Sequence, residues 1–263
     1  MDRGGTFVAG KVDDDNGRRQ VGLSFLFAPG TRPDADAIAR LSAAAGDVVS
    51  FAISHRPAEH PYWLELLALG LTFDLLGLAP GIAADTVSPE YAFGVPLADV
   101  HQLESLTIRP GPHLAAGGSL LPVVRAMTAL GCEFAGLPGV VAVGWEPARS
   151  VMAPDYYRRS IGSWLKGGVF PGLGLTALSR AADGVIFSVG LSFFIGQEMR
   201  FEPLAGESPA DAARLALRVI HDLVANGPYP SGQIKLSGGD TVLCEYLDNR
   251  RILRISRPSE IRS

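Results

Sequence analysis

The sequence predicts an α+β protein with mixed, largely antiparallel sheets that are covered by helices and arranged in two packed β/α lobes. The first reason is the alternation of apolar and polar residues through residues 185–202, which is typical of a strand with one buried face. The second is a long segment after Ser208 and Pro209 whose apolar residues recur at helical spacing. The third is composition: 47% of the 263 residues are hydrophobic and 19% are charged, so the chain can bury a sizeable core.

The first half of the chain reads as a β-α-β unit followed by a helix and a short strand. Pro33 lies near the start of the first helix, and Gly46 and Gly70 lie just past the two helix ends, which are common places for these residues. In order, we expect a strand over residues 21–27, a helix over 33–45, a strand over 48–54, a helix over 61–69 and a buried strand over 71–78.

The second half alternates helices with strands. Pro122 is tolerated in the first turn of one helix, and Gly227 follows the end of the longest one. The long alternating strand would span roughly 60 Å if it were straight, so we expect a bend or break near Gly196. In order within each class, we expect helices over residues 119–130, 154–166 and 208–225, and strands over 140–145, 172–179, 185–201, 241–247 and 251–255.

Two features divide the chain into lobes. Residues 79–111 are rich in proline and glycine, so we place a boundary there, with an N-terminal lobe over residues 1–110 and a C-terminal lobe over residues 111–263. One continuous domain is the alternative. The pentapeptide Val-Gly-Leu-Ser-Phe occurs at residues 21–25 and again at 189–193. It predicts two strands in corresponding places, each with a small-residue face that a helix or a ligand covers closely.

Charge and cysteine content narrow the partners and the compartment. A formal net charge of -4 leaves no broad basic face for nucleic acid. The apolar stretches at residues 62–84 and 114–143 are interrupted by charges and prolines, so we expect buried core elements and no membrane span. Only Cys132 and Cys244 occur, and the first residues lack the long apolar core of a secretory signal, which together suit a reducing cytoplasm. The sequence does not indicate an oligomeric state.

Motifs for metal, cofactor and nucleophilic chemistry do not fit. His55 and His60 are five residues apart with Pro57 between them, which is not the spacing of a helical zinc motif. A loop with His113 as a third ligand is the remaining route to a metal, and we expect no metal. The sequence contains no G-x-S-x-G elbow and no phosphate-binding glycine loop, so we expect no cofactor and assign no catalytic residue.

Three carboxylates and one histidine are candidates for a cleft between the lobes. Asp74 lies in an apolar segment, where a carboxylate needs a partner or has a raised pKa. Glu146 follows the end of a strand, and Glu198 lies on the polar face of the long strand. Together with His113, these side chains suit acid and base roles if they converge. The simpler alternative is a capping role for Asp74 and a surface position for the glutamates.

Three short motifs flank the long helix: Gly190-Leu191, Gly196-Gln197-Glu198 and Gly238-Gly239-Asp240-Thr241. In this combination they resemble a bacterial family known only as a domain of unknown function, family number 4261, over roughly residues 112–256. The family pattern commonly has proline where this chain has Gln197. The resemblance implies a mixed α/β fold and no assigned activity, so it supplies no catalytic residues.

Two function classes are consistent with these observations. The first is a non-catalytic protein-binding module, such as an inhibitor, immunity or adaptor protein, with another protein as its partner. It predicts a shallow surface with exposed aromatic residues and no convergent polar pocket. The second is a small-molecule enzyme that uses carboxylates or histidine in a cleft between the lobes. The missing catalytic motifs favour the first class. The aromatic residues expected at its surface are Tyr91, Phe93, Tyr156 and Tyr229.

Overall fold

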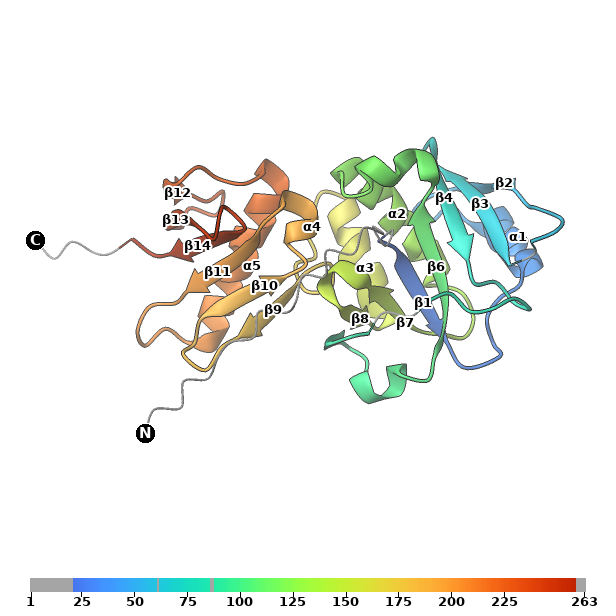
Figure 1. Cartoon of the computed structure of the whole chain (residues 1–263), viewed down its shortest axis with the longest axis horizontal. Helices are drawn as coiled ribbons and strands as arrows, with labels where there is room; N and C mark the ends of the chain where they lie inside the picture. The colour runs from blue at the N-terminus through green and yellow to red at the C-terminus, as the bar shows by residue number, and fades with distance from the viewer. Residues whose placement is uncertain (1–20, 61, 86–87, 259–263) are drawn as a thin grey trace, which may run out of the picture.

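The fold is α+β, as the sequence predicts, with two mixed sheets and helices packed against them (Figure 1). The computed structural model describes residues 21–258 except for residues 61, 86 and 87. No helix in this part of the chain is both long enough and apolar enough to cross a membrane.

The first sheet has eight strands: β1 (Leu23–Phe27), β2 (Phe51–His55), β3 (Trp63–Ala68), β4 (Leu71–Leu76), β5 (Tyr91–Phe93), β6 (Glu104–Pro110), β7 (Val140–Trp145) and β8 (Ser150–Met152). Their order is β2-β3-β4-β6-β1-β7-β8-β5. The central strand β1 pairs antiparallel with β6 and β7, and all of its residues are buried. The edge strand β5 runs parallel to β8.

Among the described residues, three α-helices lie with this sheet: α1 (Ala35–Ala44), α2 (Leu121–Phe134) and α3 (Pro154–Leu165). We call this sheet and its helices the first half, and the second sheet, given below, with its helices the second half. Helix α2 packs on β1, β4 and β6, and α3 packs on α2 and β7. The Asp34 side chain caps α1 by accepting a hydrogen bond from Ala37 N at 2.7 Å. The described part of this half also has three 3-10 helices: η1 (Leu97–Val100), η2 (Pro112–Gly117) and η3 (Glu146–Ala148).

The second sheet has six strands: β9 (Ala177–Arg180), β10 (Ile186–Val189), β11 (Glu198–Glu202), β12 (Gly232–Lys235), β13 (Thr241–Leu247) and β14 (Ile252–Ser256). Their order is β12-β13-β14-β11-β10-β9, and β11 runs parallel to β14. The short helix α4 (Ser192–Ile195) joins β10 to β11, and the long helix α5 (Pro209–Asn226) lies against the sheet (Figure 1).

Helix α5 matches the predicted long helix closely. Ser208 caps it, since its hydroxyl accepts a hydrogen bond from Asp211 N at 3.1 Å. Leu217, which also has the spacing of an inward residue, is only partly buried. The side chains on the buried face of the helix include Leu215, Ala216, Val219, Ile220 and Leu223.

The predicted helix over residues 61–69 is wrong, because residues 63–68 form β3. Alternate residues of this segment, Leu64, Leu66 and Ala68, are buried, which is the pattern of a strand. Leu69 and Gly70 both have positive φ angles, of 51° and 77°, and turn the chain into β4. The glycine that suggested a helix end is therefore part of a hairpin turn.

The single long strand over residues 185–201 is also wrong, because the chain reverses between two short strands. Gly190 follows β10 with a φ of 86°, and α4 begins two residues later. Gly196 has a φ of 76° and ends α4, so the expected break does occur at this residue, and it is part of a chain reversal. Strands β10 and β11 then pair antiparallel.

The repeated pentapeptide does not mark corresponding strands. Residues 21–25 lead into β1 at the centre of the first sheet. Residues 189–193 span the end of β10, a turn and the start of α4. Ser192 is exposed, so the expected tightly covered strip is absent at the second copy. The prediction of two equivalent strands is therefore wrong.

The chain changes from one sheet to the other between Met152 and Ala177. The first sheet continues past residue 110 through β7 and β8, so the sheets do not divide at that residue. Buried apolar residues of both sheets form one contact cluster, which includes Phe25 of β1 and Phe201 of β11. The two halves therefore share a core.

Candidate functional site

Aromatic side chains fill the junction between the two halves. The ring of Trp145, at the end of β7, lies 5.3 Å from that of Phe193 and 6.4 Å from that of Phe194 in α4, measured between centroids. Phe194 lies 5.1 Å from Phe170, which lies 5.5 Å from Trp164 of α3. Most of these contacts are edge-to-face, a favourable geometry for aromatic pairs. The cluster ties the first sheet and α3 to α4.

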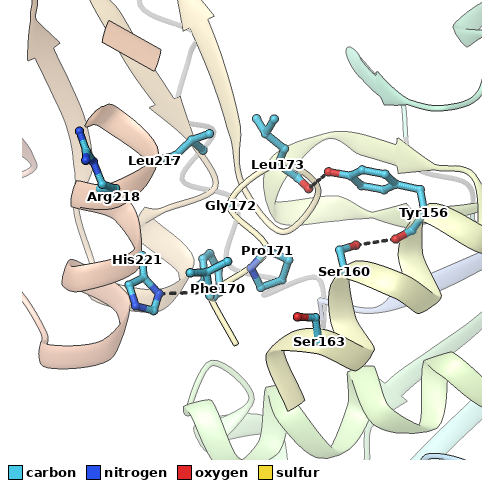
Figure 2. Close-up of a pocket in the computed structure, with 11 residues that line it drawn as sticks. Tyr156, Ser160, Ser163, Phe170, Pro171, Gly172, Leu173, Leu217, Arg218 and His221 are labelled. Carbon is cyan, nitrogen blue, oxygen red and sulfur yellow. Dashed lines mark hydrogen bonds between the residues drawn. The ribbon is translucent and has the colours of Figure 1, made fainter. Parts of the chain in front are cut away.

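A hollow of about 380 Å³ lies between the two halves and has Phe170 in its wall (Figure 2). We name it the junction hollow. Most of its exposed lining is apolar carbon. Its lining comes from three segments that are far apart in the sequence: Tyr156, Ser160 and Ser163 of α3, residues 169–173, and Leu217, Arg218 and His221 of α5.

Several polar groups around the junction hollow have partners within the protein. The Tyr156 hydroxyl donates to Leu173 O at 2.8 Å, and burial raises its pKa, so it stays protonated. The Ser160 hydroxyl donates to Tyr156 O at 2.6 Å within α3. Phe170 N donates to His221 Nδ1 at 3.0 Å. A ring nitrogen that accepts a hydrogen bond carries no proton, so the neutral His221 ring carries its proton on Nε2.

A second hollow, of about 490 Å³, lies along the neighbouring face of α3, and we name it the charged hollow. Its lining residues are Asp47, Val48, Asp155, Arg158, Arg159, Gly162, Leu165 and Lys166. All of its charged residues are exposed, and none of them forms an ion pair with another described residue. Glu133 lies next to Val48, but its Oε1 accepts hydrogen bonds from Val48 N at 2.8 Å and Val49 N at 3.0 Å.

The predicted candidate Glu198 holds the reversal between β10 and β11. Its Oε1 accepts hydrogen bonds from Gly190 N at 3.0 Å, Ser192 N at 3.0 Å and Ser192 Oγ at 2.7 Å. Its Oε2 accepts from Ser188 Oγ at 2.5 Å and Leu191 N at 3.3 Å. Since both oxygens are occupied by donors of the same turn, this carboxylate has a structural role.

Asp74 lies on β4 and points away from the buried side chains of Phe73 and Leu75. Its cross-strand neighbours are Glu65 of β3 and Arg109 of β6. Burial raises its pKa and outweighs a hydrogen bond from Trp63, while the charge of Glu65 adds to the increase and that of Arg109 opposes it. Its Oδ1 has no hydrogen-bond partner among the described residues. Asp74 lines neither hollow.

The other two candidates lie in different places. His113 is exposed in η2. Glu146 begins η3, and the backbone of this turn presses on Gly190: a Cβ added to Gly190 would lie 2.7 Å from Pro147 O. Glu146 and Glu198 are therefore attached to turns that touch, but neither they nor His113 lines either hollow. Neither of the two hollows brings the four candidates together.

His55 and His60, whose spacing does not fit a helical zinc motif, both contact aromatic residues. His55 lies 5.5 Å from the ring of Trp63, and His60 Nδ1 lies 3.0 Å from the Tyr62 hydroxyl in a hydrogen bond. Across the described residues, no group of three or more His, Cys, Asp or Glu side chains is placed to hold a metal ion.

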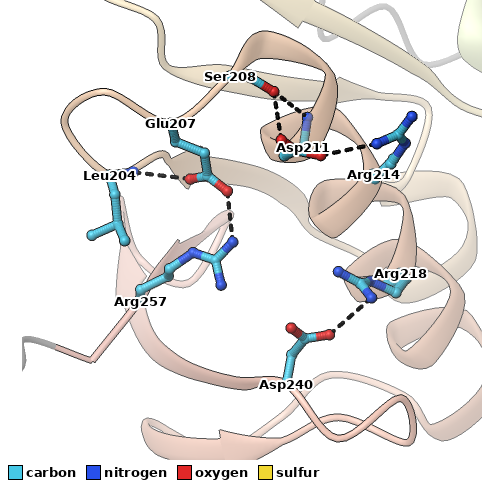
Figure 3. A network of polar contacts seen from close by, with 8 residues as sticks. All are labelled: Leu204, Glu207, Ser208, Asp211, Arg214, Arg218, Asp240 and Arg257. Carbon is cyan, nitrogen blue, oxygen red and sulfur yellow. Dashed lines mark hydrogen bonds and ion pairs between the residues drawn. The ribbon is translucent and has the colours of Figure 1, made fainter.

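The motifs that carry the family resemblance have structural roles in this fold. Gly190, Leu191 and Glu198 form the turn described above. Gly239 has a φ of 90° in the turn between β12 and β13. The next residue, Asp240, pairs with Arg218 of α5 at 3.1 Å (Figure 3). This pair fixes the hairpin turn to α5.

A second set of contacts fixes the start of α5 (Figure 3). Glu207 accepts hydrogen bonds from Leu204 N at 3.0 Å and from Arg257 at 2.6 Å. Although burial opposes ionisation, these bonds and the charge of Arg257 lower the pKa of Glu207. The network joins the loop after β11 to the residue after β14, so it stabilises the second half and offers no free catalytic group.

Sequence reasoning missed the junction hollow. Tyr156 was expected as a surface aromatic residue, but it is partly buried, stacks at 6.0 Å on Phe93 and lines the hollow. One usable signal was the spacing of Leu217 and His221, which are four residues apart and share a face of α5. The third wall, residues 169–173, carries no pattern that points to a site.

No family model, curated protein or solved structure matches this chain. The geometry of the two hollows is therefore the basis for a functional proposal.

Proposed function

We propose that the protein is a non-catalytic binding module whose partner is another protein, and that the junction hollow receives an apolar side chain of that partner. The observation that carries this proposal is the character of the hollow, which is mostly apolar and whose Tyr156, Ser160 and His221 already bond to the chain itself. A volume of about 380 Å³ lies in the usual range for binding pockets and has room for an aromatic side chain.

A small-molecule enzyme is the alternative, and the position of the junction hollow between the two halves favours it. It receives less support, because none of Asp74, His113, Glu146 and Glu198 lines the hollow. Glu198 in particular is occupied by hydrogen bonds from Gly190, Leu191, Ser188 and Ser192.

An inhibitor, immunity or adaptor role in a bacterial cytoplasm is the finer proposal. Cys132 and Cys244 are free and buried, and burial raises the pKa of their thiols to about 12 and about 11. Unpaired, protonated thiols suit a reducing compartment. Membership of family 4261 is part of the same proposal and rests on the quoted motifs alone.

Selection from a library of displayed random peptides tests this function. Immobilised protein should enrich peptides that share an aromatic or large aliphatic residue. Ser163→Trp should abolish their binding, because Ser163 is exposed at the hollow and the larger side chain would fill it. Ser119→Trp is the matched control, since Ser119 is exposed outside both hollows. No enrichment, or enriched peptides that bind the Ser163→Trp variant equally well, would refute the proposal.

A further inference from the structure

We infer that the partner segment is acidic and crosses α3, with its apolar side chain in the junction hollow and its carboxylates on Arg159 and Lys166. This inference rests on the proposed function and adds to it the charge and the path of the partner.

The two hollows share one helix, α3. Ser163 lines the junction hollow, whereas Arg159 and Lys166 line the charged hollow. Arg159 lies four residues before Ser163 and Lys166 lies three residues after it, so both are its neighbours on the surface of α3. These two cations therefore form the ridge that separates the hollows. A segment that places a side chain in the junction hollow and continues across α3 has to pass over them.

The surface along this path carries more positive than negative side chains. Arg158, Arg159 and Lys166 are exposed and have no ion pair with any residue in the described ranges. The acidic residues of the charged hollow, Asp47 and Asp155, are fewer than its cations. Because the whole chain has a net charge of -4, this local excess of positive charge stands out against an acidic protein. Complementary charge steers a partner and fixes its register.

An exposed apolar rim lies beside the ridge. Val169 is 69% exposed and lines the junction hollow just after α3 ends. Arg125 contacts the same end of the helix, where it donates to Leu165 O at 3.0 Å and lies 4.7 Å over the ring of Trp164. Apolar surface next to cations fits a segment in which an aromatic or aliphatic residue is flanked by aspartate or glutamate.

Titration of the isotope-labelled full chain with three synthetic peptides tests this inference. Each peptide carries one tryptophan, flanked by glutamate in the first, glutamine in the second and lysine in the third. The glutamate peptide should shift the amide resonances of residues 155–173 and bind at least about tenfold more tightly than the glutamine peptide at low ionic strength. Its affinity should fall as salt is added, because the contacts are exposed charge pairs.

Charge-reversal variants assign the effect to the ridge. Arg159→Glu/Lys166→Glu should lower the affinity for the glutamate peptide at least about tenfold and leave the affinity for the glutamine peptide unchanged. The control Lys235→Glu/Arg251→Glu makes the same change in net charge at two exposed residues, one in β12 and one in the turn before β14, and should have no effect. Asp155→Asn should raise the affinity for the glutamate peptide, since it removes a carboxylate from the charged hollow.

Several results would overturn the inference. If the three peptides bind with equal affinity and none of them binds the Ser163→Trp variant, the proposed binding function stands but the partner is not acidic. Binding unaffected by the Arg159/Lys166 reversal would lead to the same conclusion. A thymidine oligonucleotide that displaces the glutamate peptide at equal concentration would replace an acidic protein segment by a general polyanion. If no amide resonance of residues 155–173 shifts, the peptide does not dock along α3. The library selection would then test the binding function separately.

Discussion

The two copies of Val-Gly-Leu-Ser-Phe in this chain adopt different structures. Residues 21–25 enter a central strand, where β1 pairs with β6 and β7. Residues 189–193 end a strand, turn at Gly190 and begin α4. The difference shows that the pentapeptide alone does not determine its conformation. The acceptor groups available to its backbone N–H atoms are one difference between the two sites.

Those groups differ in kind at the two sites. In the first copy, neighbouring strands on both sides supply ladder partners, and the Ser24 hydroxyl meets the Thr107 hydroxyl at 3.1 Å. In the second copy, the carboxylate of Glu198 accepts from three successive backbone N–H groups. Glu198 follows Gly190 by eight residues, whereas the residue eight positions after Gly22 is Gly30. The second copy therefore has a carboxylate eight residues after its glycine that accepts hydrogen bonds from the turn, and the first copy has none at that position.

The largest expected effect comes from alanine at the two glycines of the repeat. Gly190→Ala should lower the free energy of unfolding by about 3 kcal/mol or more, because φ is 86° and the new Cβ would lie 2.7 Å from Pro147 O and 2.8 Å from Ala148 Cα. Gly22→Ala should cost less, about 1–2 kcal/mol: its φ is not positive, and its close contacts are the Thr107 side chain at 2.7 Å and Ile108 O at 3.0 Å. Equilibrium urea unfolding measures both. Equal losses would mean that the turn at Gly190 is not a constraint.

Removal of the carboxylate should have the next largest effect. Glu198→Ala leaves the N–H groups of Gly190, Leu191 and Ser192 without their acceptor, and should cost about 2–3 kcal/mol in the same assay. Glu245→Ala is the control, because Glu245 forms an exposed ion pair with Arg254 that contributes at most about 1 kcal/mol. If the two variants lose the same stability, the carboxylate does not hold the turn.

The sequence predicted elements that are decided locally. The cap Ser208 with Pro209 fixes the start of α5, and β7 occupies the predicted residues 140–145. It did not predict β3, because Gly70 after an apolar segment fits a helix end as well as a hairpin turn. It did not predict the chain reversal at Gly190, where backbone N–H groups donate hydrogen bonds to the side chain of Glu198. The junction hollow was also out of reach, because packing brings α3, residues 169–173 and α5 together.

The serines of the repeat should show a smaller difference. Ser24→Ala should cost about 1 kcal/mol, since Ser24 is buried and its hydroxyl bonds to Thr107. Ser192→Ala should cost less, because Ser192 is exposed and Glu198 keeps its other donors. A greater loss for Ser192→Ala, measured by urea unfolding, would place the hydroxyl and not the backbone N–H groups at the centre of the turn.

The smallest effect concerns Asp74, whose cross-strand neighbour Arg109 packs over Gly22 of the first copy. Burial raises the pKa of Asp74 above its ordinary value of 3.8. A folded-state pKa above the unfolded value means that the folded state prefers the protonated acid. Its contribution to stability is therefore fully present below pH 3.8 and is lost as the pH rises through the raised value.

Asp74→Asn should accordingly be more stable than the natural chain at neutral pH and equal to it in acid. Asp211→Asn provides the opposite case, because a hydrogen bond from Ser208 leads the contacts that lower the pKa of Asp211. Its stabilising contribution is present above pH 3.8 and is lost as the pH falls through the lowered value, so this variant should be less stable at neutral pH only. Urea unfolding at neutral and acidic pH compares the two. Effects of the same sign would show that burial does not control the ionisation of Asp74.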